Sequence, residues 1–460
     1  MSSISLLNTA REGLSSHQTA INLTGSNITN VNTPGYTRQV AVFSSLGCVK
    51  VGAGQVQLGV EIEKIGRVYD RFLEVQINDK MNDLGYSKAK KGILEKVEII
   101  FNESDGDGIS ELLDKFWSSW EDLSANPSGI VERHALVSAA QNLASVFRSS
   151  SDELVSVQND ANTEISGLIG QANSYMSDIA DLNMKIGAIR TGKGDANNLR
   201  DKRDEALKGL AEIFDFQYLE DSNGAINVFL PNGMPLVMGD RIWELDVEPN
   251  PANSSFYDVV FKDDTTAVLH DTITKGKLAG FLEIRDTKIA NYLDDLNSLA
   301  ASIIAEVNNR HQLGYDMGQN LGGVFFEPAT EAENMRVSSD ILEDVNKIAA
   351  SETVNGDGGN AELIGAFKDG LFMNSGTSTF NDYYASFVGK VGQDLAGEER
   401  GLDHHTNLMN QLVNKREGIS GVSIDEEMTN LIKYQLGYNS AARLCNVADE
   451  LIDTLLNLVR

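Results

Sequence analysis

The sequence predicts a mainly α-helical protein with a β insertion, an α+β fold, from three observations. Apolar residues recur every seven positions at both ends of the chain, long stretches without proline have helical periodicity, and one central stretch alternates between apolar and polar residues. A chain of 460 residues is long enough for about three domains. We therefore expect a discontinuous terminal coiled-coil domain, a long-helix middle domain and a small outer β domain.

The two ends of the chain carry the coiled-coil pattern. A seven-residue repeat with two apolar positions keeps one seam of a helix turned towards a partner helix. At the N-terminal end the two sets are Leu7, Leu14, Ile21, Ile28 and Ala10, His17, Thr24, Val31. At the C-terminal end they are Leu431, Tyr438, Cys445, Ile452, Val459 and Tyr434, Ala441, Ala448, Leu455.

We expect these ends to pair with each other and to polymerise with neighbouring subunits. One antiparallel pair buries only one face of each helix, so apolar residues on the remaining faces need other partners. The predicted polymerisation interface is Leu7, Leu14, Ile21, Ile28, Leu431, Tyr434, Tyr438, Ile452 and Leu455. The residues expected to face neighbours are Leu6, Val447, Leu451, Leu456 and Leu458.

The middle of the chain holds long helical stretches, at 69–101, 128–190, 276–311 and about 383–416. The second has no proline and, as one helix, would be on the order of 90 Å long at 1.5 Å per residue. Residues 214–275 differ, because they alternate at 225–230 and hold turn signals at Asn223-Gly224 and Asn232-Gly233, which predicts short strands. The predicted domains are 1–40 with 422–460, 41–213 with 276–421, and the β insertion 214–275.

The charge of the chain excludes two classes of partner. The chain has 38 Lys and Arg against 67 Asp and Glu, a net charge of −29, and no short stretch dominated by basic residues. Such a surface repels phosphate backbones and anionic lipids, so we expect neither nucleic acid nor membrane as a partner. Residues 1–25 lack an apolar run of signal-peptide length. Alone, this predicts a cytosolic protein, unless export uses an uncleaved N-terminal signal.

Several candidate sites are better explained as ordinary structure. Glu103, Asp105, Asp107 and Gly108 resemble the start of a calcium loop, but the twelfth position is Asp114 instead of a bidentate Glu, so we favour a solvated turn. Gly52, Gly54 and Gly59 lack the spacing of a phosphate-binding loop and indicate a hairpin turn.

Other chemistry-bearing residues give no sign of catalysis. His404 and His405 point to different helix faces, and there is no HExxH or GxSxG motif. Cys48 and Cys445 are expected to be free and mostly buried thiols. The sequence therefore predicts no enzyme activity, metal or cofactor.

A sharp bend follows the N-terminal repeats. Asn32, Pro34, Gly35 and Tyr36 lie in the turn signal of residues 27–39, which read NITNVNTPGYTRQ. This segment resembles the signature of the rod, hook and hook-associated proteins of the bacterial flagellum. Residues 421–435, which read GVSIDEEMTNLIKYQ, resemble the C-terminal partner of that signature.

Interior segments narrow the resemblance to the hook-associated protein 1 (FlgK) family. They lie at 101–104, 108–127, 179–183, 196–204, 376–384 and 412–417, so the resemblance covers nearly the whole chain. The β insertion and the two cysteines depart from it. The resemblance implies a structural adaptor at the junction of hook and filament, exported through the flagellar type III channel without signal cleavage.

The resemblance also implies partners: further copies in an axial ring, the hook protein, the next junction protein, and an export chaperone on the C-terminal helix. Two alternatives stay open, another axial component such as a hook or distal-rod protein, and a secreted coiled-coil adhesin. An enzyme within the β insertion is a third alternative that the lack of catalytic motifs disfavours.

Overall fold

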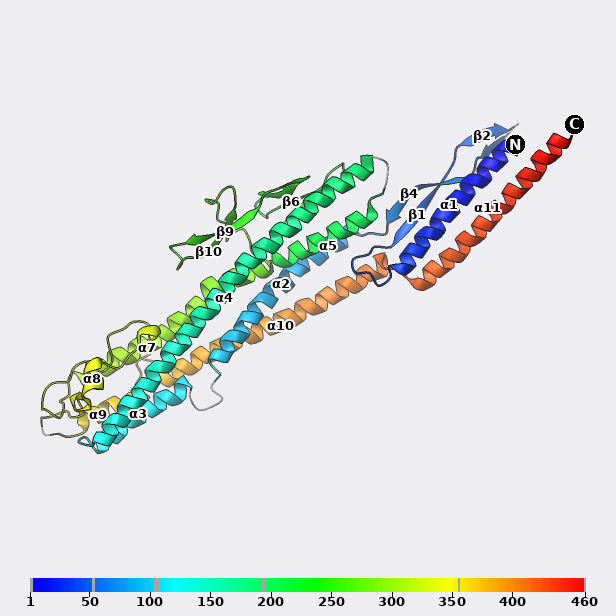
Figure 1. The fold of residues 1–460 in the computed structure, drawn as a ribbon. Helices are drawn as coiled ribbons and strands as arrows, with labels where there is room; N and C mark the ends of the chain where they lie inside the picture. Colours follow the sequence, from blue (N-terminus) through cyan, green and yellow to red (C-terminus); the bar gives the residue numbers. More distant parts are fainter. Residues whose placement is uncertain (1–2, 52–53, 103–107, 192–194, 355, 459–460) are drawn as a thin grey trace.

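The protein is elongated, with both ends of the chain at the same end of the molecule (Figure 1). The computed structural model describes residues 3–51, 54–102, 108–191, 195–354 and 356–458. A terminal arm leads into a body of long helices, and the β insertion lies on one side of that body. The predicted class, mainly α with a β insertion, is confirmed.

The terminal arm consists of two helices and four strands. Helices α1 (Ser3–Thr29) and α11 (Ile424–Leu458) lie side by side in opposite directions. Strand β1 (Gln39–Ser45) pairs antiparallel with β4 (Val60–Arg67), and β2 (Cys48–Val51) pairs with β3 (Gly54–Gln57). Two hydrogen bonds hold the strand region alongside α1. Thr9 Oγ1 donates to Leu58 O at 2.8 Å, and Ser16 Oγ donates to Val60 O at 3.2 Å.

These strands correct one expectation. The predicted middle domain begins at residue 41, whereas β1 and β4 pack on α1 in the terminal arm. The strands are short and largely half-buried, so their apolar residues give only a weak alternating pattern. We expected a hairpin at Gly52, Gly54 and Gly59. Strands β2 and β3 pair on either side of residues 52–53, which lie outside the described residues, and Gly54 begins β3.

Long helices build the body, and the four predicted helical stretches are confirmed. They are α2 (Arg71–Ile100), the 62-residue α4 (Ile130–Thr191), α6 with α7 (Gly276–Glu283 and Ile289–His311), and α10 (Phe380–Ser420). Shorter helices α3 (Ile109–Ala125) and α5 (Asn197–Ile213) pack against α4. Asp70 begins α2 by accepting from the N–H groups of Phe72 and Leu73.

The end of the body farthest from the termini holds an aromatic core. Phe116, Trp117 and Trp120 of α3 are fully buried. Phe116 contacts Phe325 and Phe326, Trp120 contacts Phe325, and Trp117 stacks on Phe380. Around them lie η2 (Ala332–Asn334), α8 (Ser339–Glu343), η3 (Val345–Lys347), α9 (Gly359–Gly365) and η4 (Ala366–Asp369). The irregular region 312–379 is therefore ordered by this core.

The β insertion has two small sheets. One has the order β5 (Gln217–Glu220), β6 (Ile226–Phe229), β7 (Pro235–Met238), β8 (Arg241–Ile242), and the other pairs β9 (Leu245–Asn250) with β10 (Phe256–Phe261). Asn183 of α4 ties the first sheet down, because its Nδ2 donates to Ile226 O and Gly239 O, both at 2.8 Å.

Arg285 ties the second sheet down from a π-helical turn, η1 (Ile284–Lys288), between α6 and α7. Its side chain is fully buried, and Nη1 donates to Asn162 Oδ1 and Tyr257 O, both at 2.8 Å. Nε and Nη2 bind the two carboxylate oxygens of Asp286 at 2.7 and 2.8 Å. A fully paired guanidinium thus joins β10 to the helical body.

Candidate assembly surface

The two terminal helices are in contact in a single antiparallel register. A Cβ built at Gly13 would lie 3.4 Å from Ala441 Cβ, and one built at Gly437 would lie 2.5 Å from His17 Cε1. About three turns further along, Asn27 Nδ2 donates to Glu427 Oε2 at 3.0 Å. Small residues at the seam let the two backbones approach closely.

The structure places the predicted interface residues in two kinds of position. In α1 the buried residues are the small and polar ones, namely Ala10, Gly13, Ser16, Ala20, Thr24 and Asn27. The larger residues lie beside this seam and are half-buried, namely Leu7, Leu14, Ile21 and Ile28. In α11 the predicted residues lie on the face that contains the buried Ala441 and Ala448, and Leu431, Tyr434, Tyr438 and Ile452 are half-buried. The side chain of Leu455 lies outside the described residues.

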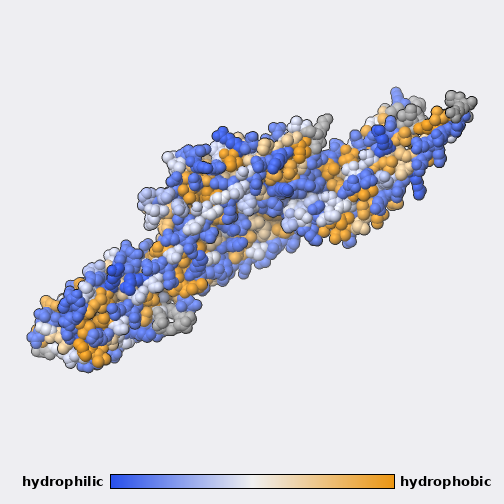
Figure 2. Space-filling model, viewed as in Figure 1, coloured by the Kyte–Doolittle hydropathy of each residue, from blue (hydrophilic) through white to orange (hydrophobic). Residues whose placement is uncertain are grey.

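Helix α11 carries a series of exposed apolar side chains along its length. Exposure runs from 42 % at Leu444 to 63 % at Leu436 and Leu456. The row is Ile424, Met428, Ile432, Leu436, Leu444, Val447, Leu451 and Leu456. Apolar residues are visible along the terminal arm in Figure 2. We call these eight residues the outer row of α11. Of the other residues expected to face neighbours, Leu6 is half-buried and the side chain of Leu458 is outside the described residues.

The predicted bend follows directly after α1. Thr33 N donates to Asn30 O and Tyr36 N to Thr33 O, while Asn32 and Pro34 are exposed. Gly35 has a φ of +75°, and a Cβ there would lie 2.7 Å from the Glu205 side chain. Glycine is therefore needed both for the left-handed backbone and for the approach of α5.

Asn27 organises the bend from inside. The residue is 1 % exposed, and its Nδ2 donates to Gln39 O at 2.9 Å as well as to Glu427. Its Oδ1 accepts from Tyr36 Oη at 2.8 Å and from Gln39 N at 3.1 Å. Burial raises the pKa of Tyr36, so its hydroxyl remains a proton donor at neutral pH. All the hydrogen-bonding capacity of this amide is used.

Arg38 joins the bend to the start of α11. Its Nε lies 2.8 Å from Glu427 Oε1 and its Nη1 lies 2.7 Å from Glu426 Oε2. Its backbone N–H donates to Ser420 O at 2.9 Å, where α10 ends. Glu427 is 2 % exposed, so this carboxylate is held by Arg38 and Asn27 instead of by water.

The first turns of α5 hold the other side of the bend. Asp201 accepts from Thr37 N at 3.2 Å and from Arg67 Nη1 at 2.8 Å, and Asp204 lies 2.7 Å from the same nitrogen. Burial disfavours the charge of Arg67, yet Asp204 and Asp201 outweigh it, so the pKa of Arg67 is raised. Burial raises the pKa of Asp204, and Arg67 opposes this. The arm is therefore fixed to the body by buried polar contacts that the sequence pattern does not reveal.

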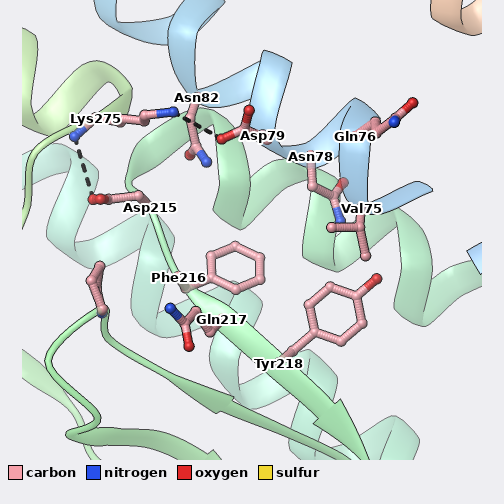
Figure 3. A pocket seen from close by; sticks show the side chains of 11 residues that line it. Val75, Gln76, Asn78, Asp79, Asn82, Asp215, Phe216, Gln217, Tyr218 and Lys275 are labelled. Carbon is pink, nitrogen blue, oxygen red and sulfur yellow. Dashed lines mark hydrogen bonds and ion pairs between the residues drawn. The ribbon is translucent and has the colours of Figure 1, made fainter. Parts of the chain in front are cut away.

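A pocket of about 570 Å³ lies between α2 and β5 (Figure 3). Phe216 and Tyr218 face Asn78 across it, and Lys275 closes one side. Lys275 Nζ lies 2.8 Å from Asp79 and 3.2 Å from Asp83, and its backbone N–H donates to Asp215 at 3.3 Å. The charged groups that line the pocket are thus paired with each other, and their arrangement indicates no particular ligand.

The candidate metal and catalytic residues form no site in the part of the chain that the structure describes. No group of three or more His, Cys, Asp or Glu side chains there could hold a metal ion. Glu103, Asp105 and Asp107 lie outside the described residues. Cys48 and Cys445 are free, as expected, but Cys48 is exposed and Cys445 is half-buried, so the expectation that both are mostly buried is wrong. Among the described helices, none is long and apolar enough to cross a membrane.

Comparison with known proteins assigns the family. The family model of the flagellar hook-associated protein FlgK helical domain matches residues 94–326, half of the chain. A model of the flagella basal body rod protein matches residues 7–37, and one of the flagellar basal body rod FlgEFG protein C-terminal region matches 418–458. The last two matches cover α1 and α11.

Relatives are similar along their full length. Flagellar hook-associated protein 1 of Bacillus subtilis is 28 % identical, over 98 % of this chain and 97 % of its own. The Escherichia coli protein of the same name is 26 % identical, over 99 % and 100 %. The solved structure of the flagellar hook junction protein FlgK from Burkholderia pseudomallei has the same fold, with a TM-score of 0.68 and 16 % identity over 75 % of this chain and 100 % of that one. The chain therefore belongs to the flagellar hook-associated protein FlgK family and is an axial component of the bacterial flagellum.

Proposed function

We propose that this chain is a non-enzymatic adaptor of the hook–filament junction that polymerises into an axial ring through its paired terminal helices. The observation that carries the proposal is the outer row of α11, eight exposed apolar residues on one helix. Several large apolar side chains that are exposed along one helix mark an interaction surface. Burying the exposed half of one of them would contribute about 1 kcal/mol.

The layout of the molecule supports the same proposal. The polymerising part comprises residues 1–40 with 422–460, and the β1–β4 strands lie on α1 within the same arm. The middle domain comprises residues 41–213 with 276–421, apart from those strands, and makes lateral contacts with neighbouring subunits. The β insertion, residues 214–275, points outward. The hook protein and the next junction protein are the proposed neighbours along the axis.

Export is part of the proposal. The chain leaves the cell through the flagellar type III channel without cleavage of a signal, and a cytoplasmic chaperone covers the C-terminal helix beforehand. The outer row of α11 supports the proposal of a chaperone. Its exposed apolar residues would favour aggregation before assembly unless another protein covered them.

Deletion of the gene in a motile host tests the junction role. Electron microscopy is expected to show hooks without filaments, with filament protein lost to the medium. Intact filaments would contradict the proposal and would favour an adhesin stalk.

Substitution of Leu436→Ser tests the outer row, with Leu219→Ser as a matched control. The two leucines are 63 % and 64 % exposed, but Leu219 lies on β5 in the outer insertion. Plasmids carrying each variant are introduced into the deletion host. We expect Leu436→Ser to reduce the number of filaments per cell and Leu219→Ser to restore it fully. Equal restoration by both would remove the outer row from the interface.

A further inference from the structure

The seam between α1 and α11 offers little steric information about its register. Ala10, Ala20, Ala441 and Ala448 are buried there, and Gly13 meets Ala441. Gly13 and Ala20 are seven positions apart, as are Ala441 and Ala448. A slip by one heptad would place Gly13 opposite Ala448 and Ala20 opposite Ala441, small against small again. Packing of these residues alone therefore does not distinguish the two registers.

One buried polar contact crosses this seam and does distinguish them. Asn27 Nδ2 and Glu427 Oε2 lie 3.0 Å apart, and the two residues are 1 % and 2 % exposed. In the slipped pair Asn27 would face Tyr434, and Glu427 would lie beyond the end of α1. The slip would break this hydrogen bond and leave a donor of the buried Asn27 amide without its acceptor, which is unfavourable. We propose that the Asn27–Glu427 contact sets the register of the terminal helix pair, as single buried polar residues do in coiled coils.

Glu427 acts as the positioning residue in this contact. Its other oxygen accepts from Arg38 Nε at 2.8 Å. The remaining bonds of Asn27 go to Gln39 and Tyr36, within its own segment. Removing the carboxylate of Glu427 thus deletes the contact between the helices and leaves the bend its own hydrogen bonds.

The chain supplies a matched control one residue away. Glu426 also binds Arg38, at 2.7 Å, but its side chain is 61 % exposed and it does not contact Asn27. A substitution at Glu426 removes one carboxylate from the same arginine without touching the seam.

A second contact, the packing of His17 on Gly437, also depends on the register and has to be distinguished from the Asn27–Glu427 hydrogen bond. His17 packs on Gly437 in the observed register and would meet Leu444 in the slipped pair. This fit is steric and survives any substitution at Glu427. A variant of Glu427 therefore asks whether the polar contact is needed when the fit of His17 is intact.

Engineered disulfides report the register in the full-length chain. In a Cys48→Ser, Cys445→Ser background, Gly13→Cys with Ala441→Cys reports the observed register, since the two Cβ positions are 3.4 Å apart. Ala20→Cys with Ala441→Cys reports the slip. In the observed register those two positions are offset by seven residues, roughly 10 Å along the helix, beyond the reach of a disulfide. Each pair is equilibrated in a glutathione buffer and quantified by peptide mapping.

The expected result is a change in the ratio of slipped to observed cross-link. Glu427→Leu raises this ratio at least tenfold, and Glu427→Gln raises it less, because the amide oxygen still accepts from Asn27. Glu426→Leu leaves the ratio unchanged.

Two outcomes overturn the proposal. An unchanged ratio in Glu427→Leu would mean that other contacts, such as the fit of His17 on Gly437 and the bond from Arg38 N–H to Ser420 O, set the register without Glu427. Loss of both cross-links in both Glu427 variants would mean that Glu427 holds the pair together without selecting its register.

The inference deepens the proposed function, but its test concerns single chains and needs no assembly. A variant that keeps the observed register but does not restore filaments would contradict the proposed role of the outer row in assembly. A variant of Glu427 that shifts the register would support the role of Glu427, whether or not filaments form.

Discussion

The imidazole of His17 packs directly on Gly437 of the opposite terminal helix. A Cβ at Gly437 would stand 2.5 Å from His17 Cε1. The same imidazole contacts the rings of Phe43 and Tyr434, at centroid distances of 5.8 and 6.4 Å. The absence of a side chain at Gly437 makes room for a ring that joins α1 to α11 and to β1.

Substitution of Gly437→Ala is expected to loosen the terminal helix pair. The added methyl group displaces His17, and such overpacking costs about 1–3 kcal/mol. Hydrogen exchange should show less protection in α1 and α11 while α4 is unchanged. Gly25→Ala is the control, because nothing lies within 4 Å of its added Cβ, and it should stabilise α1 by up to about 1 kcal/mol. Equal protection in the two variants would contradict the proposed fit.

Substitution of Arg67→Gln is expected to destabilise the joint between arm and body. It leaves Asp201 and Asp204 without the guanidinium that lies 2.8 and 2.7 Å from them, at a cost of about 3–5 kcal/mol. Urea unfolding followed by a probe in the arm measures this cost. Arg241→Gln, an exposed arginine stacked on Trp243, should stay within about 0.5 kcal/mol of the wild type.

The loss of stability in Arg67→Gln, measured as the free energy of unfolding, should depend on pH. Burial raises the pKa of Asp204 even beside Arg67, and removing Arg67 raises it further. A carboxyl whose folded pKa lies above its unfolded value destabilises the fold at higher pH, and this loss is relieved as pH falls towards about 4. The difference from wild type should therefore be smaller at pH 5 than at pH 7.5. A deficit that grows on acidification would exclude Asp204 as its source.

Substitution of Arg285→Lys is expected to release the β9–β10 hairpin from the helical body. Lysine cannot reproduce the four bonds from one planar guanidinium to Asn162, Tyr257 and Asp286. We expect a loss of about 3 kcal/mol. Hydrogen exchange should rise in β9 and β10 and stay unchanged in α1 and α11. An increase in hydrogen exchange spread evenly over the chain would show that Arg285 stabilises the whole fold and not only the attachment of the β9–β10 hairpin.

His311 is expected to make the body sensitive to acid. It accepts from Ala349 N at 2.9 Å through Nε2, so Nδ1 carries the proton that is donated to Gly323 O at 2.8 Å. Burial lowers the pKa of His311 to about 4. The unfolded chain takes up this proton near pH 6.5, so stability falls between about pH 6.5 and 4, by about 3 kcal/mol from this residue.

The variant His311→Gln isolates this effect. It should be less stable than wild type at pH 7, by about 1–3 kcal/mol for the lost hydrogen bonds. Its stability should change less between pH 6.5 and 4, which thermal unfolding at a series of pH values measures. A slope as steep as that of the wild type would assign the acid sensitivity to other groups.

The long helices could be predicted because their apolar residues are large and regularly spaced. Residues such as Ile165, Met176 and Ile179 of α4 are all fully buried, so hydrophobic periodicity reports their packing directly. The turns of the β insertion were predicted for a similar reason. Gly224 and Gly233 have φ values of +83° and +87°, which few residues other than glycine adopt.

The seam of the terminal helices was harder to predict. In α1 its buried positions are residues such as Gly13 and Ala20, which contribute little to a hydrophobic pattern, whereas Leu14 and Ile21 beside them contribute strongly. Asn27 and Glu427 are four hundred positions apart in the sequence, and polar residues at these places are read as exposed. Only the folded structure shows that they are buried together.

The chain crosses from arm to body at two places that are fastened to each other. One crossing lies between β4 and α2 and the other between α10 and α11. Arg38 joins them, because its O accepts from Val68 N at 2.8 Å and its N–H donates to Ser420 O at 2.9 Å. A single covalent crossing would allow the arm to rotate about its bonds. Two crossings, clamped side by side, oppose such rotation. Torque applied to the terminal helices therefore reaches the helical body as a couple, and the subunit turns as one piece.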